Sequence, residues 1–523
     1  MFLATFHISE FFLNIDFIDF TDIFIYNKVA KRQKNVRFWR LFNLKGLQPM
    51  DLIAREEELK LLNHSINKKE SQFIAVYGRR RVGKTYLIRE AFANQFCFSH
   101  TGYYRQSRTE QLTGFWKSLK KAGLSRDCQC PQNWKEAFDL LEKIIDQSHA
   151  EKKILFLDEI SWMDTPRCDL LPALEHFWNA YASARKDVVL IVCSSATSWV
   201  IDHVIHNKGG LHNRLTLNIH LQPFTLSEVE AYLQFLDVPM SRAQVIEGYM
   251  SLGGVPYYWS HIEKGMSIEQ YIDYLFFRRG ALLKDEFTYL FDSLFRFPDA
   301  YLKIIHALAG KRKGLTRNEL LEETGLYSAG GVSKKLEELE NCDFIRSYTS
   351  YGNRKESLYQ LIDPFVLFYY HFLEHRSMDP EFWMHQSNSP KANTWKGLSF
   401  ELVCLLHTQE IKAALGVASV MTEVFSFSVQ KNPAEGIHGS QIDLVIKRAD
   451  RVTNLCEIKY AQNEYLITKE TDESLRRKRS DFIRTTKTKN AIHMTMIAPY
   501  GVISNIYTGN LDSVITADDL FRA

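Results

Sequence analysis

Apolar runs and amphipathic stretches alternate along the chain from Met50 onward. The nearly continuous apolar runs, which predict buried strands, lie at 73–78, 153–163, 187–197 and 215–224. Between them, apolar residues recur every three or four positions, which predicts helices at 55–66, 83–96 and 170–182. Strands that alternate with helices in this way indicate an α/β fold whose parallel sheet is covered on both faces.

The pattern changes after residue 224. Residues 225–297 carry only helical periodicity, which predicts a helical lid. The next segment indicates three helices and then a hairpin that turns at Tyr351–Asn353, as in a winged helix-turn-helix. The polar segment 384–394 predicts a linker, and the rest of the chain mixes helices with short strands. The expected parts are an extension at 1–49, the α/β core at 50–224, the lid at 225–297, the winged helix at 298–375 and a C-terminal domain at 390–523.

Length and composition are those of a folded multidomain protein. At 523 residues the chain is too long for one hydrophobic core, so we expect three or four domains. The apolar fraction of 45% and the charged fraction of 24% are ordinary for a soluble protein. A net charge of +3 gives no global attraction for nucleic acid, so any such signal must be local. The eight cysteines lack the paired spacing of a zinc site, which favours free thiols in a reducing cytoplasm.

The first 49 residues differ from the rest of the chain. Residues 1–27 are rich in Phe and Ile, but four acidic residues interrupt them and no basic segment precedes them. This pattern fits neither a signal peptide nor a membrane span, which needs about 20 nearly uncharged residues. We expect an upstream extension of a cytoplasmic protein, with Met50 as the natural start. The alternative is an anchor at a membrane interface, because a basic run follows at 28–40.

The segment GRRRVGKT, Gly78–Thr85, lies between the first predicted strand and a helix, and it fits the pattern G-x-x-x-x-G-K-[ST]. Its glycines let backbone N–H groups close around phosphates at a helix N-terminus, which favours anions. Lys84 would reach the β- and γ-phosphates of ATP, and Thr85 would bind Mg²⁺. The alternative is a chance match in a structural turn.

A pair of acidic residues ends the second predicted strand, ILFLDEI. Asp158 can hold the Mg²⁺ shell, and Glu159 can orient and deprotonate the attacking water. A kinase needs no such glutamate, so the pair favours hydrolysis of ATP. The alternative is an exposed acidic turn, but the pair follows the P-loop by 73 residues on a neighbouring strand, which argues against that alternative.

Two further polar positions flank the later strands of the core. Ser194 or Ser195, after the third strand, could sense the γ-phosphate or could simply be a small turn residue. Arg214, before the fourth strand, could be an arginine finger or a surface arginine that caps a helix. The residues expected to contact ATP are Gly78, Arg79, Arg80, Arg81, Val82, Gly83, Lys84, Thr85, Tyr86, Asp158 and Ser195.

Seven segments in order along the chain carry a resemblance to a known family. They are IAREEEL, VYGRRRVGKTYLIREAF, LFLDEISWM, SSATSW, RLTLNIHLQPF, GGVPYYW and LIDPFVLFYYHF. They resemble the archaeal-type ATPases, AAA-like P-loop proteins close to the signalling NTPases. The resemblance covers 50–523 and implies a P-loop NTPase parallel sheet, a helical lid, a winged helix-turn-helix and a C-terminal α/β restriction-endonuclease-like domain. Ala54 stands where the usual first segment has glycine.

The family's C-terminal domain is similar to PD-(D/E)xK nucleases, and four residues occur here in the order of that motif. Two carboxylates on adjacent strands, Asp443 and Glu457, would bind the metal, and Lys459, two positions after the second, would activate water. Glu401 stands where the family carries a helix glutamate, and Ile442 replaces the proline of the motif name. The alternative is that Asp443 only ends a strand and that Glu457 and Lys459 form an ion pair.

Charge distribution points to partners. Seven positive residues and one negative residue lie at 476–489, a net charge of +6 that predicts a phosphate-binding surface or, alternatively, a solvated helix face. The expected recognition helix of the winged helix carries acids as well as lysines, which favours packing on the ATPase or on a protein partner over reading of bases.

We therefore expect a Mg²⁺-dependent ATPase that can form oligomers and that binds or cleaves DNA or RNA through its C-terminal domain. The alternative is a nucleotide-dependent signalling switch whose C-terminal domain binds a partner and cleaves nothing.

Overall fold

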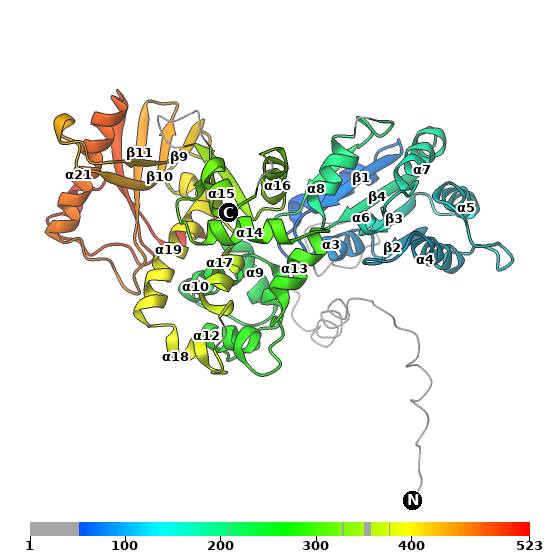
Figure 1. The fold of residues 1–523 in the computed structure, drawn as a ribbon, viewed down its shortest axis with the longest axis horizontal. Coiled ribbons are helices and arrows are strands. Elements are labelled where there is room, and N and C mark those ends of the chain that lie inside the picture. The colour runs from blue at the N-terminus through cyan, green and yellow to red at the C-terminus, as the bar shows by residue number, and fades with distance from the viewer. Residues whose placement is uncertain (1–51, 208, 327–328, 350–356, 376, 523) are drawn as a thin grey trace, which may run out of the picture.

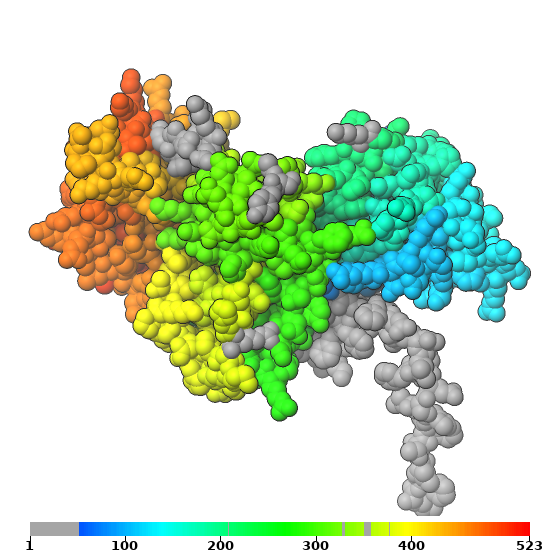
Figure 2. All heavy atoms as spheres, in the orientation of Figure 1, coloured from blue at the N-terminus to red at the C-terminus, as the bar shows by residue number. Residues whose placement is uncertain are grey.

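The computed structural model describes residues 52–207, 209–326, 329–349, 357–375 and 377–522. The α/β core, blue to blue-green in Figure 1, lies at one end, and the sheet of the C-terminal domain, orange to red, lies at the other. Green and yellow helices lie between them, and the space-filling view in Figure 2 shows the same order.

The α/β core is a parallel sheet of five strands with the order β2-β3-β4-β1-β5. The strands are β1 (Gln72–Tyr77), β2 (Phe98–Thr101), β3 (Lys153–Asp158), β4 (Val188–Ser194) and β5 (Leu217–His220). Helices cover both faces, with α2 and α3 on one side and α4, α5 and α7 on the other. The helices are α2 (Glu56–Ile66), α3 (Lys84–Ala91), α4 (Arg108–Lys121), α5 (Trp134–Gln147), α6 (Ile160–Met163), α7 (Leu170–His176) and α8 (Thr197–Val200). The predicted parallel sheet with two covered faces is confirmed.

Two local features of the core differ from the prediction. The edge strand β2 was not predicted, because its sequence FSHT alternates buried and exposed residues and has one large apolar side chain. The helix predicted to reach residue 96 ends at Ala91. Ala93 and Asn94 have φ angles of 47° and 55°, a left-handed conformation that cannot continue a right-handed helix.

Only helices follow the core up to residue 297, as predicted. They are α9 (Leu226–Phe235), α10 (Arg242–Leu252), α11 (Pro256–Trp259), α12 (Ile268–Ile272) and α13 (Glu286–Leu294). Residues 298–375, which we call the middle unit, combine helices with an antiparallel sheet of order β6-β8-β7. The unit contains α14 (Asp299–Ala309), β6 (Leu315–Thr316), α15 (Arg317–Thr324), α16 (Ala329–Asn341), β7 (Ile345–Thr349), β8 (Ser357–Leu361) and α17 (Pro364–Phe368).

The C-terminal domain is a mixed sheet of five strands with the order β13-β12-β11-β10-β9. Strands β9, β10 and β11 are antiparallel, whereas β12 and β13 continue the sheet in parallel with β11. Its elements are α19 (Pro390–Leu406), α20 (Thr408–Ala414), β9 (Thr422–Val429), β10 (Ser440–Arg448), β11 (Val452–Ile458), α21 (Lys469–Thr486), β12 (Ala491–Ile497), β13 (Ser513–Ile515) and α22 (Ala517–Leu520).

The segment predicted as a linker is folded instead. A short helix, α18 (Phe382–Gln386), buries Trp383, and the carboxylate of Asp273 accepts the backbone N–H groups of Trp383 and Met384 at 2.7 and 3.0 Å. The polar composition misled the prediction, because one tryptophan and one buried acceptor fix the segment.

Two predictions cannot be compared with the structure. The expected extension at 1–49 and the wing turn at Tyr351–Asn353 lie outside the described residues. Across the described part of the chain, every helix is too short or too polar to cross a bilayer.

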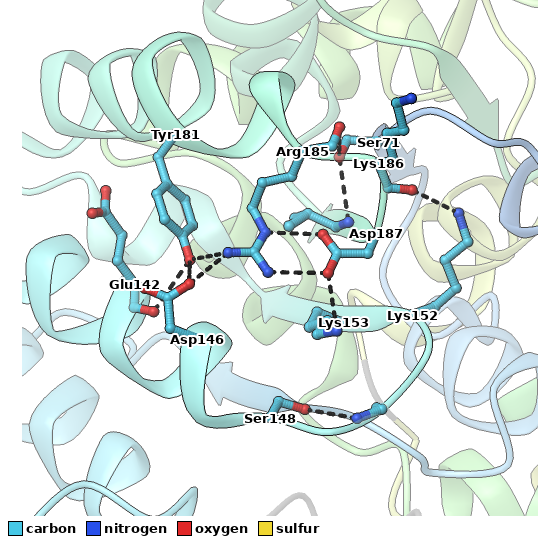
Figure 3. A network of polar contacts seen from close by, with 12 residues as sticks. Ser71, Glu142, Asp146, Ser148, Lys152, Lys153, Tyr181, Arg185, Lys186 and Asp187 are labelled. Carbon is cyan, nitrogen blue, oxygen red and sulfur yellow. Dashed lines mark hydrogen bonds and ion pairs between the residues drawn. The ribbon is translucent and has the colours of Figure 1, made fainter.

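A network of ion pairs and hydrogen bonds lies at the end of the core sheet where β3 and β4 begin (Figure 3). Arg185 donates to both carboxylate oxygens of Asp187 at 2.9 and 3.0 Å, and it also donates to Asp146 at 2.5 Å. Tyr181 donates to Asp146, and Lys153, the first residue of β3, lies 2.9 Å from Asp187. The hydrogen bonds from Arg185 hold the pKa of Asp187 well below its usual range.

We predict that Arg185→Met lowers the free energy of unfolding by about 1 kcal/mol at pH 7, the scale of a partly exposed ion pair. Because the pKa of Asp187 is lowered on folding, the stabilisation is present above the unfolded pKa and is lost as the pH falls below about 4. Denaturant titrations of wild type and variant across pH test this, with the exposed Arg126→Met as control. A difference that persists unchanged at pH 3.5 would contradict it.

Candidate functional site

The loop Gly78–Thr85 joins β1 to α3 and requires its first glycine. A Cβ added at Gly78, whose φ is +144°, would lie 2.4 Å from the carbonyl oxygen of Leu221 just after β5. Gly83, with a φ of +95°, caps the N-terminus of α3. The loop therefore turns its backbone N–H groups around a helix N-terminus, the arrangement that binds phosphate.

Lys84 and Thr85 occupy the first turn of α3, followed by Tyr86. The buried ammonium of Lys84 donates to the carbonyl oxygens of Gly78 and Arg79, both at 2.9 Å. The hydroxyl of Thr85 donates to Oδ2 of Asp158 at 3.0 Å. The hydroxyl and the carboxylate are hard oxygen ligands of the kind that Mg²⁺ prefers, so these two residues fit the ion.

Asp158 and Glu159 lie where β3 ends. Burial raises the pKa of Asp158 to about 6, and the negative charge of Glu159 adds to the rise. Glu159 has a left-handed backbone, with a φ of 46°, which starts α6 directly after the strand. Its carboxylate accepts the backbone N–H of Ser195 at 3.0 Å and a short hydrogen bond from the hydroxyl of the same residue.

Ser195 therefore contacts Glu159 through both its backbone N–H and its hydroxyl. Ser194, also fully buried, donates to Glu159 at 3.5 Å and shares a hydrogen bond of 2.7 Å with Ser161. These serines come from the strand next to β3, so two neighbouring strands hold the side chain of Glu159 in one orientation.

The three consecutive arginines of the P-loop reach outside the core. Arg79 is buried and forms an ion pair with Asp363, the residue directly before α17 in the middle unit. Its guanidinium also lies over the rings of Tyr258 and Phe344, at 6.0 and 5.4 Å from their centroids. Asp363 accepts the N–H of Val366 as the cap of α17, so the carboxylate cannot turn away from the pair without losing that bond.

The next two arginines contact α13. Arg81 lies 3.0 Å from the buried carboxylate of Glu286 and 4.0 Å above the ring centroid of Tyr257. Arg80 donates to the carbonyl oxygen of Tyr289 at 3.3 Å. The P-loop is thus fixed by side chains to the helical region and to the middle unit, while its backbone faces the nucleotide position.

Three residues of this site were not singled out from the sequence. Arg55, in the segment IAREEEL, donates to the carbonyl oxygens of Val82 and Gln222 at 3.3 and 2.7 Å and supports the P-loop. Asp363 lies in the segment LIDPF, and Glu286 lies in a helix without any motif. An acid that precedes Pro at a helix start was the available signal for Asp363, whereas Glu286 had none.

Arg214 lies at the end of the sheet where β1 begins, whereas the P-loop lies at the end where β1 stops. The backbone N–H of Thr216, two residues later, donates to Phe73 at the start of β1, whereas the P-loop follows the end of β1. Arg214 is exposed there, so it cannot reach ATP held by its own P-loop. A finger role requires a neighbouring copy of the chain.

The C-terminal carboxylates lie on adjacent antiparallel strands. Asp443 directly precedes Leu444 and Glu457 directly follows Cys456, and Leu444 and Cys456 are the last paired residues of β10 and β11 at this end. Lys459 Nζ lies 3.0 Å from Glu457 Oε1, and Lys478 of α21 lies 2.6 Å from Oε2. Burial lowers the pKa of Lys459, but Glu457 outweighs that effect and raises it.

Glu401 and Asp443 converge on one cation. Both lie against the guanidinium of Arg312 from the middle unit, in an ion pair for Glu401 and at 3.5 Å for Asp443. The described residues contain no cluster of three or more His, Cys, Asp or Glu side chains placed to hold a metal. The predicted set of Glu401, Asp443 and Glu457 is therefore divided, with two carboxylates on Arg312 and the third held by lysines.

The basic segment forms much of α21. The side chains of Arg476, Arg479, Ser480, Ile483 and Arg484 line a shallow surface hollow of about 290 Å³. Asp481, the acid within the segment, is buried and accepts bonds from His438 and Ser440. Within residues 476–486 of α21 the exposed side therefore presents positive charge, whereas the first turns of the helix carry Glu470 and Glu473 on the surface.

The core matches a known domain family. Residues 52–262 match the model of an ATPase domain found predominantly in Archaea. This span contains the P-loop, Asp158, Glu159, Ser195 and Arg214. The chain thus carries an ATP-binding P-loop ATPase domain.

Several proteins are similar to this chain. An uncharacterized protein of Methanocaldococcus jannaschii is 24% identical over 324 residues, 61% of this chain and 68% of that protein. An uncharacterized ATP-binding protein of the same organism is 44% identical over 43 residues, 8% of this chain and 73% of that protein. Among solved structures, a Walker-type ATPase of Pyrococcus abyssi has a TM-score of 0.45 and 18% identity, and it covers 62% of this chain and 97% of its own. The ORC2 protein of Aeropyrum pernix has a TM-score of 0.40 and 14% identity, with 71% and 98% covered.

The raised pKa of Asp158 predicts a pH dependence of Mg²⁺-nucleotide binding. A carboxyl with a pKa of about 6 is mostly protonated at pH 5, and a metal must displace that proton, so affinity should be about tenfold weaker at pH 5 than at pH 7. Calorimetric titration with Mg²⁺-ADP measures it. In Asp158→Asn, which has no carboxyl proton to lose, the affinity should depend on pH only through the titration of the nucleotide itself. The same pH profile in both proteins would refute the role of Asp158 as the titrating ligand.

Loss of the buried partner of Arg79 should be costly. Asp363→Leu leaves a buried guanidinium without its carboxylate, which destabilises by about 3–5 kcal/mol. The double variant Arg79→Met with Asp363→Leu should recover most of that loss, because no unpaired charge remains. Denaturant unfolding of the single and double variants decides the point, and a double variant no more stable than the single one would contradict it.

Proposed function

We propose that the chain hydrolyses ATP with Lys84 on the β- and γ-phosphates and Glu159 as the base for the attacking water. The contact of Thr85 with Asp158, next to a glutamate held by Ser195, is the observation that carries this proposal. Thr85 and Asp158 would hold Mg²⁺, which would supply positive charge against the phosphates. Ser195 keeps the carboxylate of Glu159 in one orientation, which favours hydrolysis because a general base must be positioned.

The proposal extends to the C-terminal domain as a PD-(D/E)xK-like domain that binds or cleaves nucleic acid. Support comes from the cross-strand placement of Asp443 and Glu457, with Lys459 beside the latter and Glu401 on the preceding helix. Glu401 and Asp443 would hold a magnesium ion, since one or two protein carboxylates commonly bind it. The positive face of α21 would bind the backbone of DNA or RNA.

The middle unit would carry the nucleotide state to that domain as a winged helix used for packing. Its helix α16 packs on the core, where Ser198 donates to the carbonyl oxygen of Glu338 and Lys334 lies 3.7 Å from Asp202. Asp363 holds Arg79 of the P-loop at one side. At the other side Arg312 contacts Glu401 and Asp443 of the C-terminal domain, in the space that we call the C-terminal cleft. ATP binding around the P-loop would therefore reposition the C-terminal domain on nucleic acid.

Oligomers would supply Arg214 to the ATP of a neighbouring copy. Its exposed position at the far edge of the sheet suits contact in trans, because it cannot serve its own P-loop.

A second candidate is a nucleotide-dependent signalling switch with an inactive C-terminal domain. The observation that favours it is the pairing of Glu457 with two lysines, Lys459 and Lys478, which neutralise the carboxylate without a metal. In this case the domain would bind a protein partner and cleave nothing.

Substitutions in the P-loop separate binding from turnover. Lys84→Ala should abolish ATP binding, because it removes the positive charge that would contact the β- and γ-phosphates. Glu159→Gln should bind ATP but hydrolyse it at least about 100-fold more slowly, because the base is lost. Equilibrium binding and steady-state hydrolysis measure the two effects, and normal turnover by Glu159→Gln would remove Glu159 from the base role.

The C-terminal proposal predicts metal-dependent cleavage that uses residues which ATP hydrolysis does not need. Asp443→Ala or Lys459→Ala should remove cleavage of DNA or RNA while ATP hydrolysis stays at the wild-type level, since the two sites share no residues. Charge reversal of Arg476 and Arg479 should weaken nucleic-acid binding and flatten its salt dependence.

Cleavage assays with Mg²⁺ or Mn²⁺, and binding titrations at two salt concentrations, measure these effects. Absence of cleavage by the wild type, combined with binding that charge reversal leaves unchanged, would favour the signalling switch.

A further inference from the structure

The loop between α14 and β6 carries three successive cations, Lys311, Arg312 and Lys313, to the C-terminal cleft. The guanidinium of Arg312 pairs with Glu401 of α19 and lies 3.5 Å from Oδ1 of Asp443 on β10. A cavity of about 220 Å³ opens beside this contact, and both sides of the cleft line it. The middle unit thus places its own positive charge on the two carboxylates proposed above for a divalent cation.

The position of Arg312 is fixed by the sheet of the middle unit. The amide of Gln360 on β8 donates to the carbonyl oxygen of Arg312 at 2.8 Å. Tyr348 on β7 donates to the carbonyl oxygen of Lys313 at 2.5 Å. Gly314, with a φ of +75°, passes so close to Tyr359 that an added Cβ would lie 2.1 Å from its carbonyl oxygen. Arg312 therefore moves with the middle unit as a whole.

A guanidinium and a divalent cation cannot both use these oxygens. Two neighbouring carboxylates repel each other and are stabilised by a positive charge, which Arg312 supplies from outside the domain. Magnesium would need the carboxylate oxygens that the guanidinium contacts. When only the withdrawn state can bind, the apparent metal affinity equals the intrinsic affinity multiplied by the fraction of molecules in that state.

We infer that Arg312 is a built-in competitor of the divalent cation at Glu401 and Asp443, and that metal binds when the middle unit withdraws it. The inference rests on the proposed function of the C-terminal domain. It concerns Arg312 alone, because Lys459 and Lys478, which hold Glu457, belong to the C-terminal domain itself and stay there when the middle unit moves.

The test is the Mn²⁺ affinity of the full chain without nucleotide, measured from the electron paramagnetic resonance signal of free Mn²⁺. Arg312→Gln should bind Mn²⁺ about tenfold more tightly than wild type, because the competing charge is gone. Lys313→Gln is the matched control, since it removes a charge from the same loop but contacts Ser428 at 3.2 Å rather than a carboxylate. Its affinity should stay within about twofold of wild type, the effect of a general change in charge.

The double variant Arg312→Gln with Asp443→Asn should lose the increase in Mn²⁺ affinity. That loss would show that the ion binds at this cleft. Arg312→Lys keeps the positive charge but not the planar fork of the guanidinium, so its Mn²⁺ affinity should lie between those of wild type and Arg312→Gln. This variant tests the inference even if Arg312→Gln is poorly folded. Equal Mn²⁺ affinity in wild type, Arg312→Lys and Arg312→Gln would overturn the competition but leave the metal site standing. Failure of every variant to bind Mn²⁺ would overturn the metal site and, with it, this inference.

Discussion

The buried ion pair between Arg79 and Asp363 fixes the P-loop to the middle unit. Both side chains are nearly inaccessible to water, and Nε and Nη2 of Arg79 have no hydrogen-bond partner among the described residues. An unpaired charge in such a place is very unfavourable, so the P-loop and the start of α17 must move together. The rest of the interface depends on that alignment, including the contact of His220 with Asp343 at 3.0 Å.

The middle unit therefore lies between two charged contacts that belong to different sites. Strand β8 ends two residues before Asp363, and its Gln360 holds the carbonyl of Arg312. One short strand thus connects the residue that pairs with the P-loop to the loop that occupies the C-terminal carboxylates. We propose that nucleotide binding at the P-loop changes which cation, Arg312 or a metal ion, contacts the C-terminal carboxylates.

The sequence predicted the local features well and the long-range ones poorly. Continuous apolar runs and the glycine–lysine loop specify the core, because burial and phosphate geometry leave few alternatives. The contact between Glu457 and Lys459 on one face of β11 followed from strand alternation. The partners of Arg79 and Arg312 did not, because an ion pair between residues far apart in sequence leaves no periodic pattern. The folded segment near Trp383 was missed for the same reason, since its acceptor, Asp273, lies about 110 residues earlier.

We propose that the nucleotide state of the P-loop changes the C-terminal cleft through the middle unit. Hydrogen exchange of residues 310–316 and 357–363 in Glu159→Gln, with and without Mg²⁺-ATP, tests it most directly. We expect ATP to change the exchange rates of both segments. Adding Arg79→Met and Asp363→Leu to the Glu159→Gln protein should abolish this change, although that protein should still bind ATP. Exchange that ATP leaves unaltered in both segments, or that it alters equally without the ion pair, would contradict the account.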